Sequence, residues 1–316
     1  MKIAYLILAH NQPEQLFKLY SSLNDEHTSF YIHVDKKSKD VESISNRFRD
    51  MPNVKVISVY EVFWMGFNMI QGSIELMKMA MASGHDYKYF VLLSGQDYPI
   101  KSKEGIRKFY EENTKDFIDY NKIAHLPAKF TTKYKLRHSY DWPYANPRDP
   151  RKITFLVKLY YRLKKVEQKL LPARKFYKDF TPYFGSQWFS LTNETVKYIL
   201  GFLAANQSYS DFMRTTEGPD ETFFHTIIGN SERRFNLSNY DQYLEWEKTW
   251  TPGAQHFRNP ISCLTFMDWS ERGKSKPAVL DMGYFDELKA TYHLYARKFD
   301  VLQSKELINK IDTNLR

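Results

Sequence analysis

The first third of the chain alternates between apolar runs and segments with helical spacing. "KIAYLILAH" (residues 2–10) is apolar throughout, as is typical of a strand buried on both faces. "NQPEQLFKLYSSL" (11–23) follows, with leucines three to four positions apart and Pro13 near its start, which indicates a helix. The same patterns predict strands at 29–37, 54–58 and 87–100 and a helix at 69–83.

This β-α-β rhythm predicts an α/β fold with a mostly parallel central sheet and helices on both faces. In such sheets, ligands bind beyond the carboxyl ends of the strands. Three expected strand ends would then share one rim, at "AHN" (9–11), "HVDKK" (33–37) and "SGQD" (94–97).

The rest of the chain is less regular, and with no repeat or clear linker we expect a single domain with irregular insertions. One helix is expected to open at "GPDETFFHTII" (218–228), and another to run from about Tyr284 toward "HLYARKFD" (293–300). An aromatic, basic loop spans 133–151. Further strands are expected at 117–123 and 183–192, and further helices at 151–171 and 193–204.

Composition and cysteine content bound the class of protein. The 316 residues are 42% hydrophobic, which is typical of a globular chain. Cys263 is the only cysteine, so no intramolecular disulfide can form, which fits a reducing compartment. The first apolar run is too short to span a bilayer and lacks a cleavage site. We expect a cytoplasmic protein, either soluble or peripheral on the inner face of the membrane.

The positive charge is concentrated in one segment. The net charge is +9, and residues 151–178 hold ten Lys or Arg and one Glu, which is also +9 (10 − 1), so the remainder is neutral. This distribution does not favour a nucleic-acid-binding protein. The helix at 151–171 carries an apolar stripe of Leu156, Leu159, Leu163, Val166 and Leu170. It could lie on anionic lipid, or pack on the domain with its basic face in water.

Several common chemistries have no signature here. The sequence lacks the phosphate-binding motifs G-x-G-x-x-G and G-x-x-x-x-G-K-[ST], the zinc motifs C-x-x-C and H-E-x-x-H, and the hydrolase motif G-x-S-x-G. It also lacks D-x-D, the acidic motif that holds a divalent cation in many nucleotide-sugar transferases. The adjacent acids Asp220 and Glu221 follow a Gly-Pro pair, where they could either begin a helix or supply a catalytic base.

Six segments in order identify a resemblance to a known family. They are "LILAHNQPEQLFKLYSSL", "FYIHVDKKS", "YFVLLSGQDYPIKS", "YFGSQWFSLT", "GPDETFFHTII" and "HLYARKFD". Together they resemble the Core-2/I-branching enzymes, glycosyltransferase family fourteen, over roughly residues 3–300. The chain is similar to a short, bacterial-type member without the stem and membrane anchor of the Golgi enzymes.

The resemblance implies a GT-A fold, an inverting mechanism, a UDP-sugar donor and no metal or other cofactor. It places the catalytic base at Glu221, and Asp220 as a cap or a partner of the base. Basic residues would neutralise the leaving diphosphate, one at Lys298 and the other at Lys276, with Lys274 as the alternative. Residues 1–125 would form the nucleotide-binding half and 126–316 the acceptor-binding and catalytic half.

Other donor residues follow from the same resemblance, and the acceptor candidates follow from side-chain chemistry. His10 and Asp35 would lie at the uridine, and Asp97 would contact the donor ribose or sugar, unless it caps its own turn. Trp188, Trp269 and Arg137 are the acceptor candidates, because sugar rings stack on aromatic faces and guanidinium groups donate to hydroxyls.

The expected function is metal-independent, inverting transfer of GlcNAc or xylose from a UDP-sugar to a hydroxyl of a glycan or lipid-linked glycan, forming a β-linkage. The alternative is a non-catalytic protein that binds anionic glycan or nucleic acid through the basic 151–178 segment.

Overall fold

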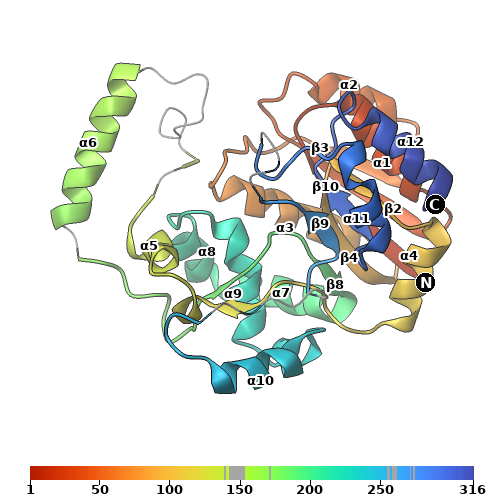
Figure 1. Cartoon of the computed structure of the whole chain (residues 1–316). Helices are drawn as coiled ribbons and strands as arrows, with labels where there is room; N and C mark the ends of the chain where they lie inside the picture. Colours follow the sequence, from red (N-terminus) through yellow and green to blue (C-terminus); the bar gives the residue numbers. More distant parts are fainter. Residues whose placement is uncertain are drawn as a thin grey trace.

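The computed structural model describes residues 1–138, 140–141, 154–170, 172–254, 257, 262–270, 272 and 275–316 (Figure 1). Its central sheet has the order β3-β2-β1-β4-β8. The first four strands are parallel and β8 runs antiparallel to β4. The expected α/β fold with a mostly parallel central sheet is therefore confirmed. The strands are β1 (Lys2–Ala9), β2 (Thr28–Val34), β3 (Val54–Ile57), β4 (Tyr87–Ser94) and β8 (Ser190–Thr192).

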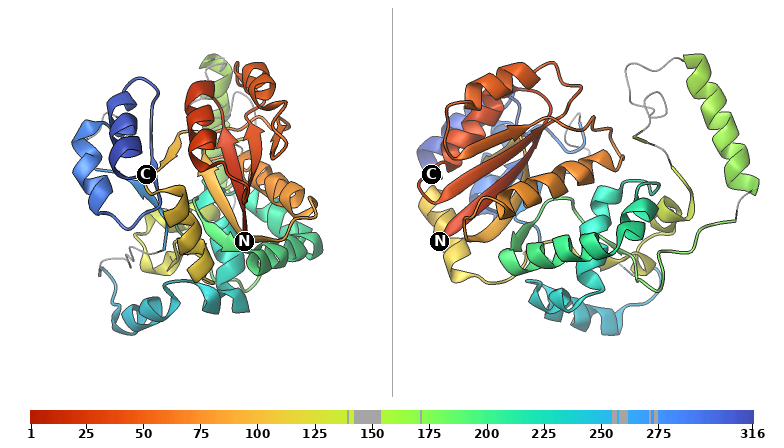
Figure 2. Two further views of the ribbon diagram at one scale, coloured as in Figure 1. Left: turned by 90° about the vertical axis from the view of Figure 1, so that its right-hand side faces the viewer. Right: turned by 180° about the vertical axis from the view of Figure 1, so that it is seen from behind.

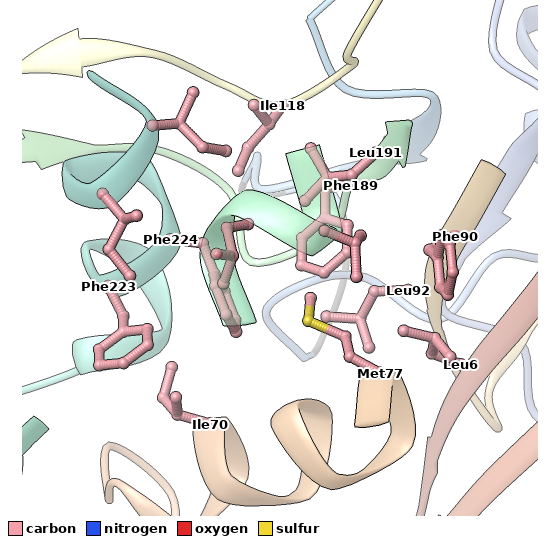
Figure 3. Packing of buried hydrophobic residues seen from close by; sticks show 14 of the residues in the cluster. Leu6, Ile70, Met77, Phe90, Leu92, Ile118, Phe189, Leu191, Phe223 and Phe224 are labelled. Carbon is pink, nitrogen blue, oxygen red and sulfur yellow. The ribbon is translucent and has the colours of Figure 1, made fainter. Parts of the chain in front are cut away.

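Both faces of the sheet are covered, which explains why β1 is apolar without alternation. Ala4 and Leu6 face a core that includes α3 (Asn68–Met81) and α7 (Asn193–Ala205), seen in Figure 3. Tyr5, Ile7 and their odd-numbered neighbours face a second core against α1 (Pro13–Leu23), α2 (Val41–Phe48) and α4 (Lys103–Glu112). Because successive strand residues point to opposite faces, each face needs its own apolar set.

Segments from the second half of the chain complete the first half. Strand β8 joins the central sheet, and β10 (Tyr295–Arg297) pairs antiparallel with β5 (Asp97–Pro99) and parallel with β9 (Thr265–Met267). A third core packs this small sheet against α11 (Phe285–Ala290) and α12 (Lys305–Asn314). Both sheets therefore contain strands from each side of residue 125, where we expected the nucleotide-binding half to end.

The prediction of a helix that runs from about Tyr284 toward residues 293–300 is wrong. After η4 (Met282–Tyr284), α11 ends at Ala290, and the segment that follows enters β10. Tyr295 and Ala296 are fully buried in the three-stranded sheet, so tertiary pairing overrides the helical spacing in the sequence.

Two expected strands are shorter than predicted. Of 117–123, only Asn121–Lys122 forms a strand, β6, which pairs with β7 (Tyr183–Phe184). The strand expected at 183–192 divides into β7 and β8, with a cleft-lining loop between them.

The remaining helices lie between residues 123 and 249. They are η1 (Ile123–His125), α5 (Lys129–Lys135), α6 (Thr154–Leu170), α8 (Gln207–Met213), η2 (Pro219–Glu221), α9 (Phe223–Gly229), η3 (Glu232–Asn236) and α10 (Tyr240–Thr249). Two of them, α5 and η2, contribute to the wall of the cleft. Helix α6 stands apart from the body of the protein (Figure 2). Within the described ranges, no helix is both long and apolar enough to cross a bilayer.

Candidate active site

The expected strand-end rim is formed by β1, β2 and β4. The Asp35 N–H donates to the Ala9 carbonyl at 2.8 Å, and the Gly95 N–H donates to the Leu8 carbonyl at 2.9 Å. These bonds hold the ends of β2 and β4 on either side of β1. The order of strands reverses at β1, which is where open α/β sheets bind ligands.

Asp35 and His10 lie at this rim, as the sequence predicts. Asp35 is buried, and its carboxylate accepts the backbone N–H groups of Lys37 and Val62 and pairs with the Lys37 ammonium. His10 is exposed at the end of β1. The surrounding protein limits hydration of its ring and lowers its pKa, and the nearby positive charge of Arg297 acts in the same direction. Both effects favour the neutral form of the ring.

Asp97 does not face a ligand-accessible surface. It is fully buried, and its carboxylate accepts the Ser94 N–H at 2.9 Å and the Arg297 guanidinium at 2.9 Å. Burial raises the pKa of Asp97, and the Arg297 charge opposes that shift. The expected contact with the donor is replaced by a structural one, since Asp97 positions Arg297 across the β5–β10 pair.

Arg297 and Lys298 stand at the end of β10, beside the rim. The Arg297 guanidinium lies 4.7 Å from the centre of the Trp188 ring, and Arg297 lines the cleft. Partial burial lowers the pKa of Lys298, and the charge of Arg297 lowers it further. Both cations also lower the pKa of His10, so both lie near the rim.

A large cleft opens beside Arg297, and the residues that line it all lie between positions 119 and 297. Its volume is about 1160 Å³, at the upper end for small-molecule sites. Glu221 and Lys133 line it together with Arg297, and its aromatic walls are Phe130, Phe184, Trp188, Phe266, Trp269 and Tyr292.

Glu221 is placed by a tight turn. Gly218 has φ 56° and ψ 53°, a left-handed conformation that glycine adopts at no steric cost, and its N–H donates to the Met65 carbonyl at 3.2 Å. The turn leads into η2, and Glu221 is its last residue, just before α9. The acid pair therefore precedes the α-helix instead of beginning it.

Lys133 of α5 is bonded directly to Glu221. Its Nζ lies 2.6 Å from Glu221 Oε2 and 4.9 Å from the centre of the Phe184 ring. Oε1 of Glu221 accepts no hydrogen bond from the part of the chain that the structure describes. One carboxylate oxygen is thus held by an ammonium group, and the other remains available to a substrate hydroxyl.

Asp220 and Glu217 are two further acidic residues close enough to Lys133 to be affected by its positive charge. Burial raises the pKa of Asp220 from an ordinary value of 3.8 to about 7, and the negative charge of Glu221 adds to the shift. Burial also raises the pKa of Glu217. The charge of Lys133 opposes both shifts. The cluster has more acids than cations, so it is built to hold a proton near neutral pH.

A second cavity of about 400 Å³ shares Asp119, Gly185, Ser186 and Ser262 with the wall of the cleft. Gly185 is required here, because a Cβ would lie 2.4 Å from Asp119 Cβ. The Asp119 carboxylate accepts the Ser186 N–H at 3.0 Å and the Ser262 hydroxyl. Burial raises the pKa of the neighbouring Cys263 to about 12, so its thiol stays protonated and unreactive.

The remaining predicted residues are only partly brought together. Trp269 is 57% exposed on the cleft wall, while Trp188 is buried beneath Arg297. Lys276 is exposed beside Pro277, which lines the cleft, and Lys274 lies outside the described residues. Arg137 is exposed but is not among the residues that line the cleft, so it is not placed to bind the acceptor there.

Lys133 is the residue that sequence reasoning missed. In "KFTTKYKLR", three lysines occur within seven positions, and nothing in the sequence separates them. Only the fold brings Lys133 against Glu221, 88 positions later. Arg297, which nothing in the sequence singles out, lines the cleft at the end of β10.

Comparisons with known proteins agree on one family. The model of the Core-2/I-Branching enzyme family matches residues 3–284. The human beta-1,3-galactosyl-O-glycosyl-glycoprotein beta-1,6-N-acetylglucosaminyltransferase is 25% identical over 99% of this chain and 69% of its own length. Xylosyltransferase 2 of Rattus norvegicus is 27% identical over the whole chain, which spans only 34% of that relative.

Among solved structures, S. aureus TarS 1-349 in complex with UDP is 16% identical, with a TM-score of 0.29 over 38% of this chain and 34% of that one. A similarity this low places no residue of one chain on the other.

Proposed function

Because the chain belongs to the Core-2/I-Branching enzyme family, we propose that it is an inverting, metal-independent glycosyltransferase. It moves GlcNAc or xylose from a UDP-sugar to a hydroxyl of a glycan or lipid-linked glycan and forms a β-linkage. The observation that carries the proposal is one cleft lined by both a carboxylate, Glu221, and a cation, Arg297. The names of the relatives, an acetylglucosaminyltransferase and a xylosyltransferase, support the two donor sugars.

In this mechanism Glu221 acts as the general base. An acceptor hydroxyl gives its proton to the carboxylate while its oxygen forms a bond to the anomeric carbon. The bond from that carbon to the diphosphate oxygen breaks on the opposite face, so the configuration inverts. Arg297 and Lys298 then meet the negative charge that grows on the departing UDP, which is where fixed charge accelerates a reaction most.

Lys133 fits this mechanism as a positioning residue. It holds Oε2 of Glu221, so the carboxylate is fixed in orientation before the acceptor binds. A base must lie within hydrogen-bonding reach of the proton that it removes, and a held carboxylate meets that requirement more often than a mobile one. The exposed ring of Trp269 on the same cleft supports an acceptor of sugar character.

The first test is Glu221→Gln, assayed for sugar transfer and donor hydrolysis across a panel of UDP-sugars. Gln keeps the shape of the side chain but cannot take the proton, so transfer should fall roughly 10²–10⁴-fold while UDP affinity stays near that of the wild type. Glu217→Gln is the matched control, because Glu217 lines the same cleft and should lose far less. Near-normal turnover of Glu221→Gln would show that Glu221 is not the general base.

Calorimetry of UDP binding in EDTA tests metal independence and the alternative of a non-catalytic binding protein. We expect binding to persist without divalent cations. Binding that disappears in EDTA and returns with Mn²⁺ would contradict metal independence, and an absence of UDP binding under any condition would favour the non-catalytic alternative.

A further inference from the structure

Helix α6 exposes a continuous apolar stripe. Its five large apolar side chains with described surroundings are all in contact with solvent: Phe155 is 72% exposed, Leu159 43%, Leu163 61%, Val166 52% and Leu170 78%. At about 100° per residue, these positions fall within about 80° of the helix circumference. Other exposed large apolar residues are scattered over the rest of the described chain.

The body of the protein does not cover this stripe. Figures 1 and 2 show α6 standing away from the sheet and from the other helices. Apolar surface left in water costs about 25 cal/mol per Å² relative to a buried state, so five adjacent side chains represent a strong preference for an apolar contact.

Cations accompany the stripe. Lys158 and Arg162 are exposed, and on the helix they lie on one flank of the stripe, about 20–60° from Phe155. The segment 151–178 carries the entire net charge of +9. A lysine or arginine beside an apolar face can bury its stem and keep its charged group at the polar boundary.

The excursion that carries α6 is held at its base. The chain leaves at Leu136 and returns at Arg174, whose N–H donates to the Lys135 carbonyl at 3.0 Å. The Arg174 guanidinium donates to the carbonyls of Tyr134, at 2.9 Å, and Leu136, at 3.3 Å, and to the Thr215 hydroxyl at 2.8 Å. Both ends of the excursion are therefore fixed to α5 and to the segment after α8.

We propose that α6 is a membrane-surface helix that lies in the headgroup region of an anionic bilayer. The apolar stripe enters the boundary of the acyl chains, and the flanking cations meet anionic headgroups. Charge complementarity selects this occupant over a second copy of the chain, because two helices from segments of +9 would repel each other.

The position of α6 also suggests how membrane binding would serve catalysis. This part of the inference rests on the proposed function. The chain before the excursion forms α5, which carries Lys133, and the chain after it leads into Gly185–Trp188; both line the cleft. A bilayer that holds α6 thus holds the cleft close to lipid-linked acceptors.

The test is co-sedimentation of the whole protein with vesicles of phosphatidylcholine alone or mixed with phosphatidylglycerol. The wild type should bind only the anionic vesicles at low salt and should be partly released by high salt. Lys158→Gln with Arg162→Gln should weaken binding about 30-fold (~2 kcal/mol at ~1 kcal/mol per basic residue). Leu159→Ser with Leu163→Ser should weaken it roughly tenfold or more.

Matched controls separate the stripe from general surface effects. Leu302→Ser removes an apolar side chain that is 80% exposed elsewhere, and Lys305→Gln removes an exposed cation at the start of α12. Both should bind as the wild type does. The α6 variants should also keep donor hydrolysis, so a failure of this proposal is distinguishable from a failure of the proposed function.

Equal binding to neutral and anionic vesicles would overturn the proposal, as would unchanged binding of the Leu159 and Leu163 variant. Light scattering supplies a further check. A dimer that depends on Leu159 and Leu163, with no vesicle binding, would make the stripe an interface between copies and would also overturn it.

Discussion

At the scale of single residues, the pairing of Glu221 with Lys133 is the central feature of the site. A general base needs an oxygen that can accept a proton and an environment that keeps the carboxylate oriented. The 2.6 Å contact with Lys133 supplies the orientation, and the left-handed Gly218 places the residue at the cleft. Asp220 and Glu217, with raised pKa values, make the same cluster sensitive to pH.

Lys133→Met should shift the acidic limb of the pH–rate profile to higher pH. The charge of Lys133 lowers the pKa values of Asp220 and Glu217, so its removal lets both rise further. The cluster would then hold its protons up to a higher pH, and activity at a given acidic pH would fall. The measurement is kcat/KM for transfer between about pH 5 and pH 9, where such a cluster titrates.

Lys129→Met is the control for this change. Lys129 lines the same cleft but is not the lysine bonded to Glu221. Its profile should follow that of the wild type. An acidic limb that stays in place in Lys133→Met would show that the pKa values of Asp220 and Glu217 do not depend on this lysine.

At the scale of elements, the antiparallel pair of β5 and β10 sets the geometry of the cationic rim. Register places Arg297 opposite Asp97, and their side chains form a buried ion pair. The pair holds the guanidinium over the Trp188 ring, facing the cleft. Asp97, which we expected to contact the donor, therefore acts indirectly by positioning Arg297.

Arg297→Ala should lower the free energy of unfolding by about 3–5 kcal/mol, because it leaves the fully buried Asp97 carboxylate without its partner. It should also weaken UDP binding, since Arg297 lines the cleft. Urea unfolding and calorimetry measure the two effects separately.

The double variant Arg297→Ala with Asp97→Asn separates the contribution of the ion pair to stability from the contribution of Arg297 to UDP binding. Removing the buried charge should restore part of the stability without restoring UDP affinity. Full additivity of the two single changes in unfolding free energy would contradict a coupled pair.

At the scale of the whole molecule, the protein consists of three cores that pack both faces of the central sheet and one side of the smaller sheet, with α6 outside them. The described apolar side chains of α6 are exposed. Helix α6 is therefore separable from the cores, whereas Asp141 before it accepts the backbone N–H groups of Phe67 and Asn68 at the start of α3.

Replacing residues 154–170, which form α6, with a short Gly/Ser linker should change the unfolding free energy by no more than about 1 kcal/mol, because longer or shorter surface loops cost little. Leu6→Ala in the central sheet should cost about 2–5 kcal/mol by comparison. Circular dichroism and urea unfolding give both values. A collapse of the linker variant would mean that α6 stabilises the cores after all.

Local sequence patterns were enough to predict the parallel sheet, its rim and the family. Long apolar runs and helical spacing are local patterns, so β1, α1, β2, β3, α3 and β4 could all be predicted from them. His10 and Asp35 could be placed for the same reason, since parallel strands end on one side of a sheet. The motif around Glu221 was recognisable because its residues are adjacent in the chain.

Contacts between distant segments could not be predicted from such patterns, because they depend on how the elements pack. Residues 293–300 form a strand instead of a helix because β5 and β9 offer backbone pairing that no local pattern reveals. The same pairing buries Asp97 and turns Arg297 to the cleft, and the fold of α5 brings Lys133 to Glu221. Spacing along a chain encodes which face of an element a residue occupies, but only packing determines which residue it meets there.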